Sequence, residues 1–363
     1  MSSKQRNCTI DLMRFVMTLA VVMVHIVTTF MKDDFFLLKG GTIAVEFFFI
    51  LSGLLLAASA DRADHTRSVA QATWKTMKSK VCAIYPMWLL ALLARMITRV
   101  IMGGYSLRKT LLMVEESTSS YLMLTNLGLL DSPAVIKYSW YIPVMLLCTL
   151  MLYPILFKWR KAFTYTLAPL IALFGCTYLF HSTGSLFTRD AWLGFTFSSV
   201  VRGGCEMCMG VMVYEAATWL QRRFSGRLTR TGRTLFTVVE AAVLVYVMYY
   251  VLRFLYPEVL LNLTLCFAVF LTIAYANVSW SAKIIRGRLW TWLGQFSLAV
   301  YLAQGVPSHL LTNVYGTMNR WLFVLLFFAM TFAVAFLLWY GAKLLTFLFR
   351  KGKTALLKAC VQD

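Results

Sequence analysis

Residues 41–60 read GTIAVEFFFILSGLLLAASA, a run in which Glu46 is the single ionisable side chain. A helix of this length covers about 30 Å at about 1.5 Å per residue, which matches the hydrocarbon core of a bilayer. The whole chain of 363 residues has the same character, with 60% hydrophobic residues, 14% charged residues and a mean hydropathy of +0.71. This composition is typical of an integral membrane protein, and it excludes a soluble multidomain protein, a disordered chain and a secreted disulfide scaffold.

Apolar runs of similar length recur along the chain, separated by short charged connections. We predict ten membrane-spanning helices, at residues 10–31, 41–60, 81–102, 138–157, 162–180, 193–219, 234–255, 257–279, 289–310 and 321–349. The expected fold class is therefore an all-α integral membrane protein. We expect a bundle of ten transmembrane helices that forms one domain over residues 1–363, with no appended soluble domain.

The charge distribution predicts the orientation of these helices. The chain has 35 Lys and Arg against 15 Asp and Glu, a net charge of +20. The tails and the connections on one predicted side hold 22 Lys and Arg, whereas the connections on the other side hold eight. Because Lys and Arg concentrate in cytoplasmic connections, we expect both termini in the cytoplasm. The basic charge then reflects topology, and no nucleic-acid partner is predicted.

The eight cysteines lie in predicted spans or cytoplasmic tails, where disulfides are not expected. Cys205 and Cys208 are three residues apart on one predicted helix, but no second pair or neighbouring histidine completes a metal site. No metal is predicted.

Ionisable side chains inside a span are costly, and they are by default functional or paired. Arg14 and His25 are eleven residues apart in the first predicted span. On a helix they differ by about 20° around the axis and by about 16 Å along it, so they share one face. Arg14 lies near the predicted cytoplasmic mouth, where a fixed cation suits a phosphate or a carboxylate.

His25 and Glu46 lie at similar distances from the connection between the first two spans, six residues before Met31 and six residues after Gly40. If these spans are antiparallel neighbours, Glu46 can hydrogen-bond to His25 and orient it as a general base. The alternative, with about equal weight, is that the two side chains satisfy each other in the bundle core.

Two other charged pairs fall inside predicted spans. Arg202 and Glu206 have the spacing of four that is typical of an intrahelical ion pair, and structural neutralisation is their favoured role. Arg95 and Arg99 lack an obvious local carboxylate, so they either face a polar cavity or extend to the membrane surface. The polar connection 103–137 either helps to hold an acceptor or is a solvated crossover.

Several motifs in order along the chain resemble those of the membrane acyltransferase-3 family. They are Arg14-x10-His25, residues 41–53 around Glu46, Ile84-Tyr85-Pro86, Trp140-Tyr141-Ile142-Pro143, Arg202 to Glu206 with Gly210, and Ser297-x3-Tyr301-Leu302. The resemblance implies a ten-helix enzyme that takes an acyl group, here expected to be acetyl, from cytoplasmic acyl-CoA. It also implies that the acceptor is a hydroxyl of an extracytoplasmic carbohydrate or lipid-linked glycan. The expected partners are acyl-CoA, this acceptor and membrane lipids, and a homodimer is left open.

The resemblance also assigns residues. It places the family's essential histidine on His25, its arginine on Arg14, its acidic residue on Glu46 and its Ser-Gly pair on Ser52 and Gly53. The other motif residues, for which a substrate-binding or structural role is expected, are Tyr85, Trp140, Arg202, Glu206, Ser297 and Tyr301. The sequence departs from the family pattern at two positions, Ala83 in place of an arginine and Gln304 in place of a frequent histidine.

A mechanism follows from this resemblance as a hypothesis. The donor's phosphates are expected on basic residues of the cytoplasmic side, namely Arg14, Lys78, Lys80, Arg222 and Arg223. His25 then either deprotonates the acceptor hydroxyl or carries the acyl group itself. Two other functions stay open on these residues: a transporter of small anions past Arg14, Arg95 and Arg99, and an inactive scaffold or sensor with the same fold.

Overall fold

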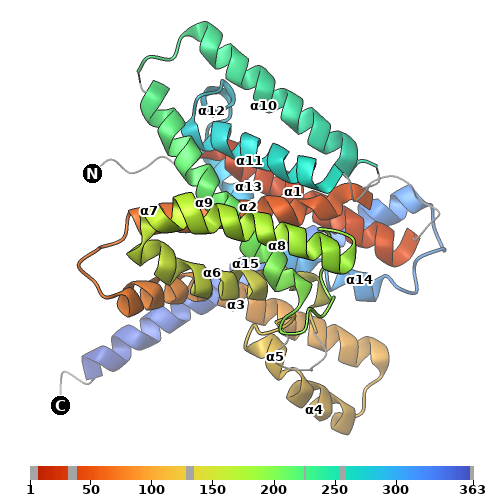
Figure 1. The fold of residues 1–363 in the computed structure, drawn as a ribbon. Coiled ribbons are helices and arrows are strands. Elements are labelled where there is room, and N and C mark those ends of the chain that lie inside the picture. Colours follow the sequence, from red (N-terminus) through yellow and green to blue (C-terminus); the bar gives the residue numbers. More distant parts are fainter. Residues whose placement is uncertain (1–6, 32–38, 128–134, 225, 254–258, 360–363) are drawn as a thin grey trace.

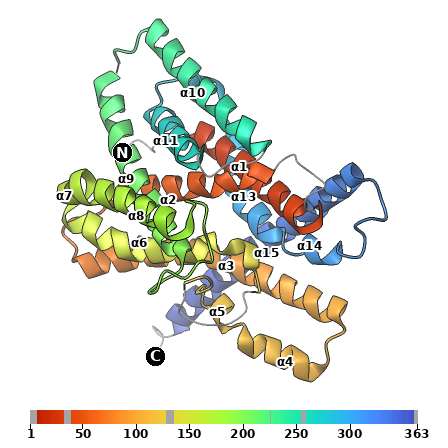
Figure 2. The same cartoon turned by 45° about the vertical axis from the view of Figure 1, so that its right-hand side comes forward.

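A computed structural model of the chain describes residues 7–31, 39–127, 135–224, 226–253 and 259–359. Within these ranges every regular element is a helix, and turns and irregular connections join the helices, with one isolated antiparallel bridge between Trp192 and Phe197. The long helices pack side by side, and the chain turns back after α3 so that α4 and the short α5 lie below the second half of α3 in both views (Figures 1 and 2).

The longer helices follow one another in the order of the predicted spans. They are α1 (Cys8–Ile26, continued by a π-helical turn, Val27–Met31), α2 (Ala44–Asp61, after a 3-10 turn, Lys39–Ile43), α3 (Val69–Gly103), α6 (Tyr141–Lys158), α8 (Ala168–Thr183, after α7, Arg160–Ala162, and a π-helical turn, Phe163–Leu167), α9 (Ser198–Phe224), α10 (Arg230–Val251), α11 (Leu260–Ala276), α13 (Arg288–Ala303) and α15 (Arg320–Ala359). Short elements join them: α4 (Leu107–Glu116), α5 (Thr118–Tyr121), a 3-10 turn (Lys137–Ser139), α12 (Ser281–Ile284) and α14 (Pro307–Leu310).

Three parts of the predictions lie outside the described residues. They are residues 128–134 of the connection 103–137, the end of the predicted span 234–255 at 254–255, and the beginning of the predicted span 257–279 at 257–258.

Seven helical segments of the described chain are long and apolar enough to cross a membrane. They are Cys8–Met31, Lys39–Asp61, Val69–Gly103, Tyr141–Lys158, Arg160–Thr183, Arg230–Val251 and Arg320–Phe349. The all-helical class with several membrane-spanning helices is therefore confirmed. At the other three predicted spans, α11 and α13 have 17 and 16 residues, and α9 contains Arg202, Glu206 and Glu215. The count of ten spans stays a prediction.

Two helix boundaries differ from the predicted ones for local reasons. Helix α3 begins at Val69, well before residue 81, because Ser68 and Gln71 form a capping box in which each side chain accepts the other's backbone N–H. Helix α13 ends at Ala303, and the predicted end at residue 310 is wrong. Pro307 cannot donate a backbone hydrogen bond to a continuing helix, and it starts α14 instead.

The centre of the bundle is the close contact between α2 and α9. A Cβ atom at Gly53 would collide with the backbone carbonyl of Met207, and one at Gly210 would collide with that of Ile50. The two glycines therefore let the helix backbones touch, as small residues do in membrane helix packing. This close approach determines which side chains of α9 face α2.

Both termini of the helical bundle lie toward the same end. In Figure 1 the beginning of α1 and the end of α15 both lie on the left. At this end Arg160 forms ion pairs with Asp61 and, at 2.6 Å, with Glu215, while the Tyr214 hydroxyl donates to Asp61 at 2.6 Å. These contacts tie α2, α7 and α9 together.

Candidate active site

A buried charge cluster joins α2 and α9. The guanidinium of Arg202 forms an ion pair with Glu46, and its Nε donates to Glu206 Oε1 at 3.2 Å. The three side chains are 2%, 3% and 7% exposed, respectively. The predicted intrahelical pair of Arg202 and Glu206 is confirmed. One oxygen of each carboxylate has no hydrogen-bond partner within the part of the chain that the structure describes.

The expected hydrogen bond between His25 and Glu46 is not found among the described contacts. Glu46 lies in the first turn of α2 and binds Arg202, whereas the ring of half-buried His25 packs on Tyr138 with the ring centroids 4.3 Å apart. A carboxylate forms a stronger contact with a guanidinium than with a neutral imidazole, and this explains the choice of partner. The idea that Glu46 orients His25 by direct contact is therefore wrong.

Tyr138, which packs on His25, is connected to other tyrosines of the bundle. The Tyr301 hydroxyl donates to the backbone carbonyl of Tyr138 at 2.6 Å. The Tyr141 hydroxyl donates to the carbonyl of Phe48 at 3.1 Å, so Ser52 Oγ must donate the 2.6 Å hydrogen bond between the two hydroxyls. Tyr301 and Tyr141 also interact electrostatically. The fold thus links Ser52, Tyr141 and Tyr301 to Tyr138 and through it to His25.

A cavity of about 480 Å³ lies between the first half of α1 and the second half of α2, at the end where the termini lie, and residues of α9 and of the end of α11 complete its lining. Its lining includes Arg14 and Asp11, which form an ion pair at 3.6 Å, and Arg62, which follows α2. A cavity of this size is in the range of small-molecule and cofactor sites. Leu51 also lines the cavity, and its neighbour Ser52 hydrogen-bonds to Tyr141.

The other residues predicted to bind the donor are placed unevenly around this cavity. Gln221 lines it, and its neighbours Arg222 and Arg223 are exposed. Lys78 is exposed on α3. Lys80 points toward α6, with its Nζ 4.0 Å from Met145 Sδ, so the structure does not bring it to the cavity. Conversely, the sequence reasoning passed over Arg62, although its position directly after an apolar run was a signal.

The remaining motif residues have structural contacts. Ser297 Oγ donates to the Gly294 carbonyl at 2.9 Å, and the ring of Trp140 lies 5.7 Å from the Arg202 guanidinium. Tyr85 is half-buried against the main hydrophobic core. Gln304 is buried and donates to the Tyr301 carbonyl at 2.9 Å. These contacts position the helices around the tyrosine cluster.

Ala83, one of the two departures from the family pattern, lines a separate cavity of about 350 Å³ between α3 and α15. Lys343 of α15 lines the same cavity, and its Nζ lies 4.6 Å from the centre of the Trp339 ring. The structure therefore places a cation of another helix beside Ala83.

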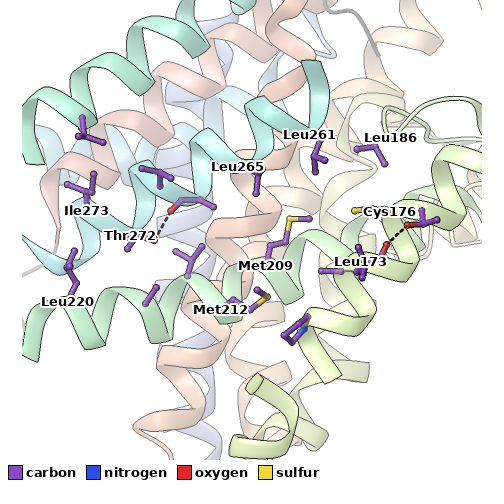
Figure 3. A pocket seen from close by; sticks show the side chains of 18 of the residues that line it. Leu173, Cys176, Leu186, Met209, Met212, Leu220, Leu261, Leu265, Thr272 and Ile273 are labelled. Carbon is purple, nitrogen blue, oxygen red and sulfur yellow. Dashed lines mark hydrogen bonds between the residues drawn. The ribbon is translucent and has the colours of Figure 1, made fainter. Parts of the chain in front are cut away.

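A larger cavity, of about 1510 Å³, lies between α8, α9, α10 and α11 (Figure 3). The sticks in Figure 3 are mostly carbon, and labelled residues such as Leu173, Met212 and Leu265 come from three different helices. An apolar cavity of this kind can hold hydrocarbon but offers little to a phosphate. The ionisable candidates lie elsewhere, around Arg14 and around His25.

Comparison with protein families identifies the chain. A family model described as an acyltransferase domain, acyltransferase 3, matches residues 9–340. The chain belongs to the acyltransferase 3 family. No curated protein and no solved structure matches it.

Membership of the acyltransferase 3 family makes the protein an O-acyltransferase, and its long apolar helices make it a multi-pass integral membrane protein. Such an enzyme needs an acyl donor and an acceptor. In this acyltransferase 3 chain, Arg14 of the predicted site residues lines the 480 Å³ cavity, and His25 packs on Tyr138. The family match thereby favours the enzyme over the transporter and the scaffold.

Proposed function

We propose that this acyltransferase moves an acetyl group from acetyl-CoA on the cytoplasmic side to a hydroxyl of a carbohydrate or lipid-linked glycan on the other side. The observation that carries the proposal is the arrangement along α1. The Arg14 cavity opens near the beginning of this helix. His25 lies about 16 Å further along the same helix. Leu51 lines the cavity, its neighbour Ser52 hydrogen-bonds to Tyr141, and Tyr138, three residues before Tyr141, packs on His25.

The proposal includes ten membrane-spanning helices with both termini in the cytoplasm. Three features support it: the helices that occupy each predicted span, the bundle ends that lie together in Figure 1, and the 22 to eight division of Lys and Arg. The Arg14 cavity then opens toward the cytoplasm, where acyl-CoA is found, and the Tyr138 side of His25 faces outward.

At the donor end, Arg14 and Arg62 bind the phosphates of acetyl-CoA. Both guanidinium groups line the same cavity, and a guanidinium offers paired N–H donors that match phosphate oxygens. Gln221 provides an uncharged polar group on the same wall, and exposed Arg222 and Arg223 extend the positive charge at its edge. The apolar walls formed by Leu51 and Leu55 suit the pantetheine arm.

At the reacting end, His25 accepts the proton of the acceptor hydroxyl while the hydroxyl oxygen bonds to the thioester carbonyl carbon. The carbon–sulfur bond then breaks, and His25 returns the proton to the departing thiolate, so that CoA leaves as a thiol. In the second version of this mechanism a ring nitrogen of His25 bonds to the thioester carbonyl carbon, and the carbon–sulfur bond breaks so that CoA leaves as a thiol with the proton of the imidazole. The acceptor hydroxyl oxygen then takes the acetyl group from the nitrogen, and its proton returns to the imidazole. Tyr138 holds the imidazole by ring contact in both versions.

The cluster of Arg202, Glu46 and Glu206 positions the helices of this site and takes no part in the reaction itself. Its side chains are buried and bound to one another. Glu46 is on the same helix as Ser52, and Ser52 binds Tyr141. The cluster therefore holds α2 in the register that places Ser52 against Tyr141.

Labelled acetyl-CoA tests this function directly. Vesicles that contain the full-length protein and envelope glycans should form alkali-labile acetyl esters, and His25→Ala should reduce the rate by about a hundredfold or more, the scale of a lost general base. His65→Ala is a matched control, because His65 is exposed, lies in the connection between α2 and α3, and stacks on Phe157 of α6. Near wild-type transfer by His25→Ala would show that the site assignment is wrong.

A further inference from the structure

Two arginines one turn apart near the end of α3 have no carboxylate partner among the described residues. Arg95 donates to the backbone carbonyl of Gly305, and Arg99 has no ion pair in the described part of the chain. Both act electrostatically on His309 of α14. A guanidinium near the end of a membrane helix can extend to the polar surface. Arg95 instead binds the Gly305 carbonyl, and Arg99 lines a cavity, so both cations are directed into the protein.

Arg99 faces a cavity of about 290 Å³ between α3 and α4. The polar side chains that line it are those of Arg99, Tyr105, Lys109, Glu116 and Ser117. Lys109 lies with its Nζ 4.0 Å above the centre of the Tyr105 ring. With one acidic and two basic side chains, the lining carries a net positive charge, to which nearby Arg95 adds.

This cavity adjoins the reacting end of the proposed active site. Its wall includes Val135, three residues before Tyr138, whose ring packs on His25. Arg95 also acts electrostatically on Tyr138. Arg189 also acts electrostatically on His25 and Tyr301, although its own charge is matched by Asp190 at 2.5 Å.

We propose that this cavity is the acceptor's anchoring site and that the acceptor is an anionic saccharide, whose carboxylate or phosphate binds Arg99 and Lys109. The proposal rests on the proposed function, which it deepens by naming the substrate class. A guanidinium with no carboxylate partner binds such a group through paired N–H donors. Glu116 accepts hydrogen bonds from the sugar hydroxyls, and a saccharide held here presents a neighbouring hydroxyl toward His25.

Binding of simple sugars tests this proposal without any acyl donor. The full-length protein, in nanodiscs of phosphatidylcholine alone, is titrated with D-glucuronate, D-glucose 1-phosphate and D-glucose. At least one of the anionic sugars should bind about tenfold more tightly than glucose, and the stronger of the two identifies the anion. Equal affinity for glucose and both anionic sugars, or no binding by any sugar, would overturn the proposal.

Arg99→Gln should abolish the preference for the anionic sugar, and Arg108→Gln should leave it unchanged. Arg108 carries the same charge on the neighbouring α4 but is exposed and does not line the cavity. If Arg99→Gln does not fold, Lys109→Gln, on the opposite wall, should reduce the preference instead. A preference that survives in the folded variant would refute the site.

The phosphate of an anionic lipid headgroup is the other ligand that suits Arg99 and Lys109. Replacing part of the phosphatidylcholine with phosphatidylglycerol should leave sugar binding intact, and displacement of the sugar would assign these cations to lipid headgroups and overturn the proposal. His25→Ala should retain sugar binding. If anionic sugars bind as expected while no acetyl ester forms from acetyl-CoA, the anion site stands and the acetyl-transfer function fails.

Discussion

Arg202 of α9 and Glu46 of α2 form an ion pair that is buried between the two helices, and Glu206 binds the same guanidinium from one turn further along α9. The pair joins helices whose backbones touch at Gly53 and Gly210. The glycine contact and the ion pair therefore both hold α2 against α9, and each can be tested by its own substitutions.

Replacement of Arg202 should be far more harmful to stability than replacement of Glu46. Arg202→Gln leaves two buried carboxylates without a cation, and loss of one partner from a buried pair costs about 3–5 kcal/mol. Glu46→Gln leaves Arg202 with Glu206, so the cluster becomes neutral and the fold should persist. Thermal unfolding in detergent, followed by size-exclusion chromatography, measures both changes. Equal loss of stability in the two variants would contradict the account of the cluster.

The α2–α9 contact should not tolerate a methyl group. Gly53→Ala and Gly210→Ala each place a Cβ against a backbone carbonyl of the facing helix, and overpacking of this kind costs about 1–3 kcal/mol. Gly204→Ala is the matched control on α9, because a Cβ there meets no atom within 4 Å. The unfolding temperature should fall for the first two variants only. If Gly204→Ala lowers the unfolding temperature by a similar amount, the loss comes from replacing any glycine of these helices and not from the α2–α9 contact.

Arg14 should contribute to donor binding. Arg14→Ala is expected to weaken binding of a non-hydrolysable acetyl-CoA analogue by about 1.5–3 kcal/mol, the scale of a hydrogen bond to a charged group, and Arg14→Lys should lose less. Arg62→Ala should show a similar loss because Arg62 lines the same cavity. Arg67→Ala is the control, since Arg67 lies in the adjoining connection and pairs with Asp64 at 3.2 Å. Calorimetry that finds unchanged affinity in Arg14→Ala would place the donor elsewhere.

Tyr301 should act as a positioning residue. Tyr301→Phe removes the hydrogen bond to the Tyr138 carbonyl, and a bond of this kind contributes about 0.5–1.5 kcal/mol. We expect kcat to fall about three- to tenfold while KM for acetyl-CoA and the unfolding temperature stay nearly unchanged. Tyr165→Phe, at an exposed tyrosine, should have no effect. A change confined to KM would instead indicate contact with the donor.

The orientation in the membrane can be tested by reporter fusions. A reporter joined after Lys353 should be active on the cytoplasmic side. A reporter inserted at Arg108, at the beginning of α4, should be active on the opposite side. The division of basic residues between the two predicted sides supports this result. If both reporters indicate the same side, the proposed topology fails, and with it the assignment of the Arg14 cavity to the cytoplasm.

Local patterns in the sequence determined the helical class, the order of the helices and the contacts within one helix. Most of the run at 41–60 became α2, because a helix satisfies the backbone groups of a mostly apolar segment internally in a bilayer. Arg202 and Glu206 met as their spacing predicted, because residues four apart on a helix are always neighbours. Motif order was sufficient to predict the family that the match over residues 9–340 shows.

Contacts between helices were decided only by the tertiary structure. Similar depth placed His25 and Glu46 together in the prediction, but depth does not determine the direction in which a side chain leaves its helix. The glycine contact between α2 and α9 brings Glu46 to Arg202, and Tyr138, from a connection, occupies the side of His25. The partner of a buried charge depends on which helices approach most closely, and that is set by packing across the whole bundle rather than by any single run of sequence.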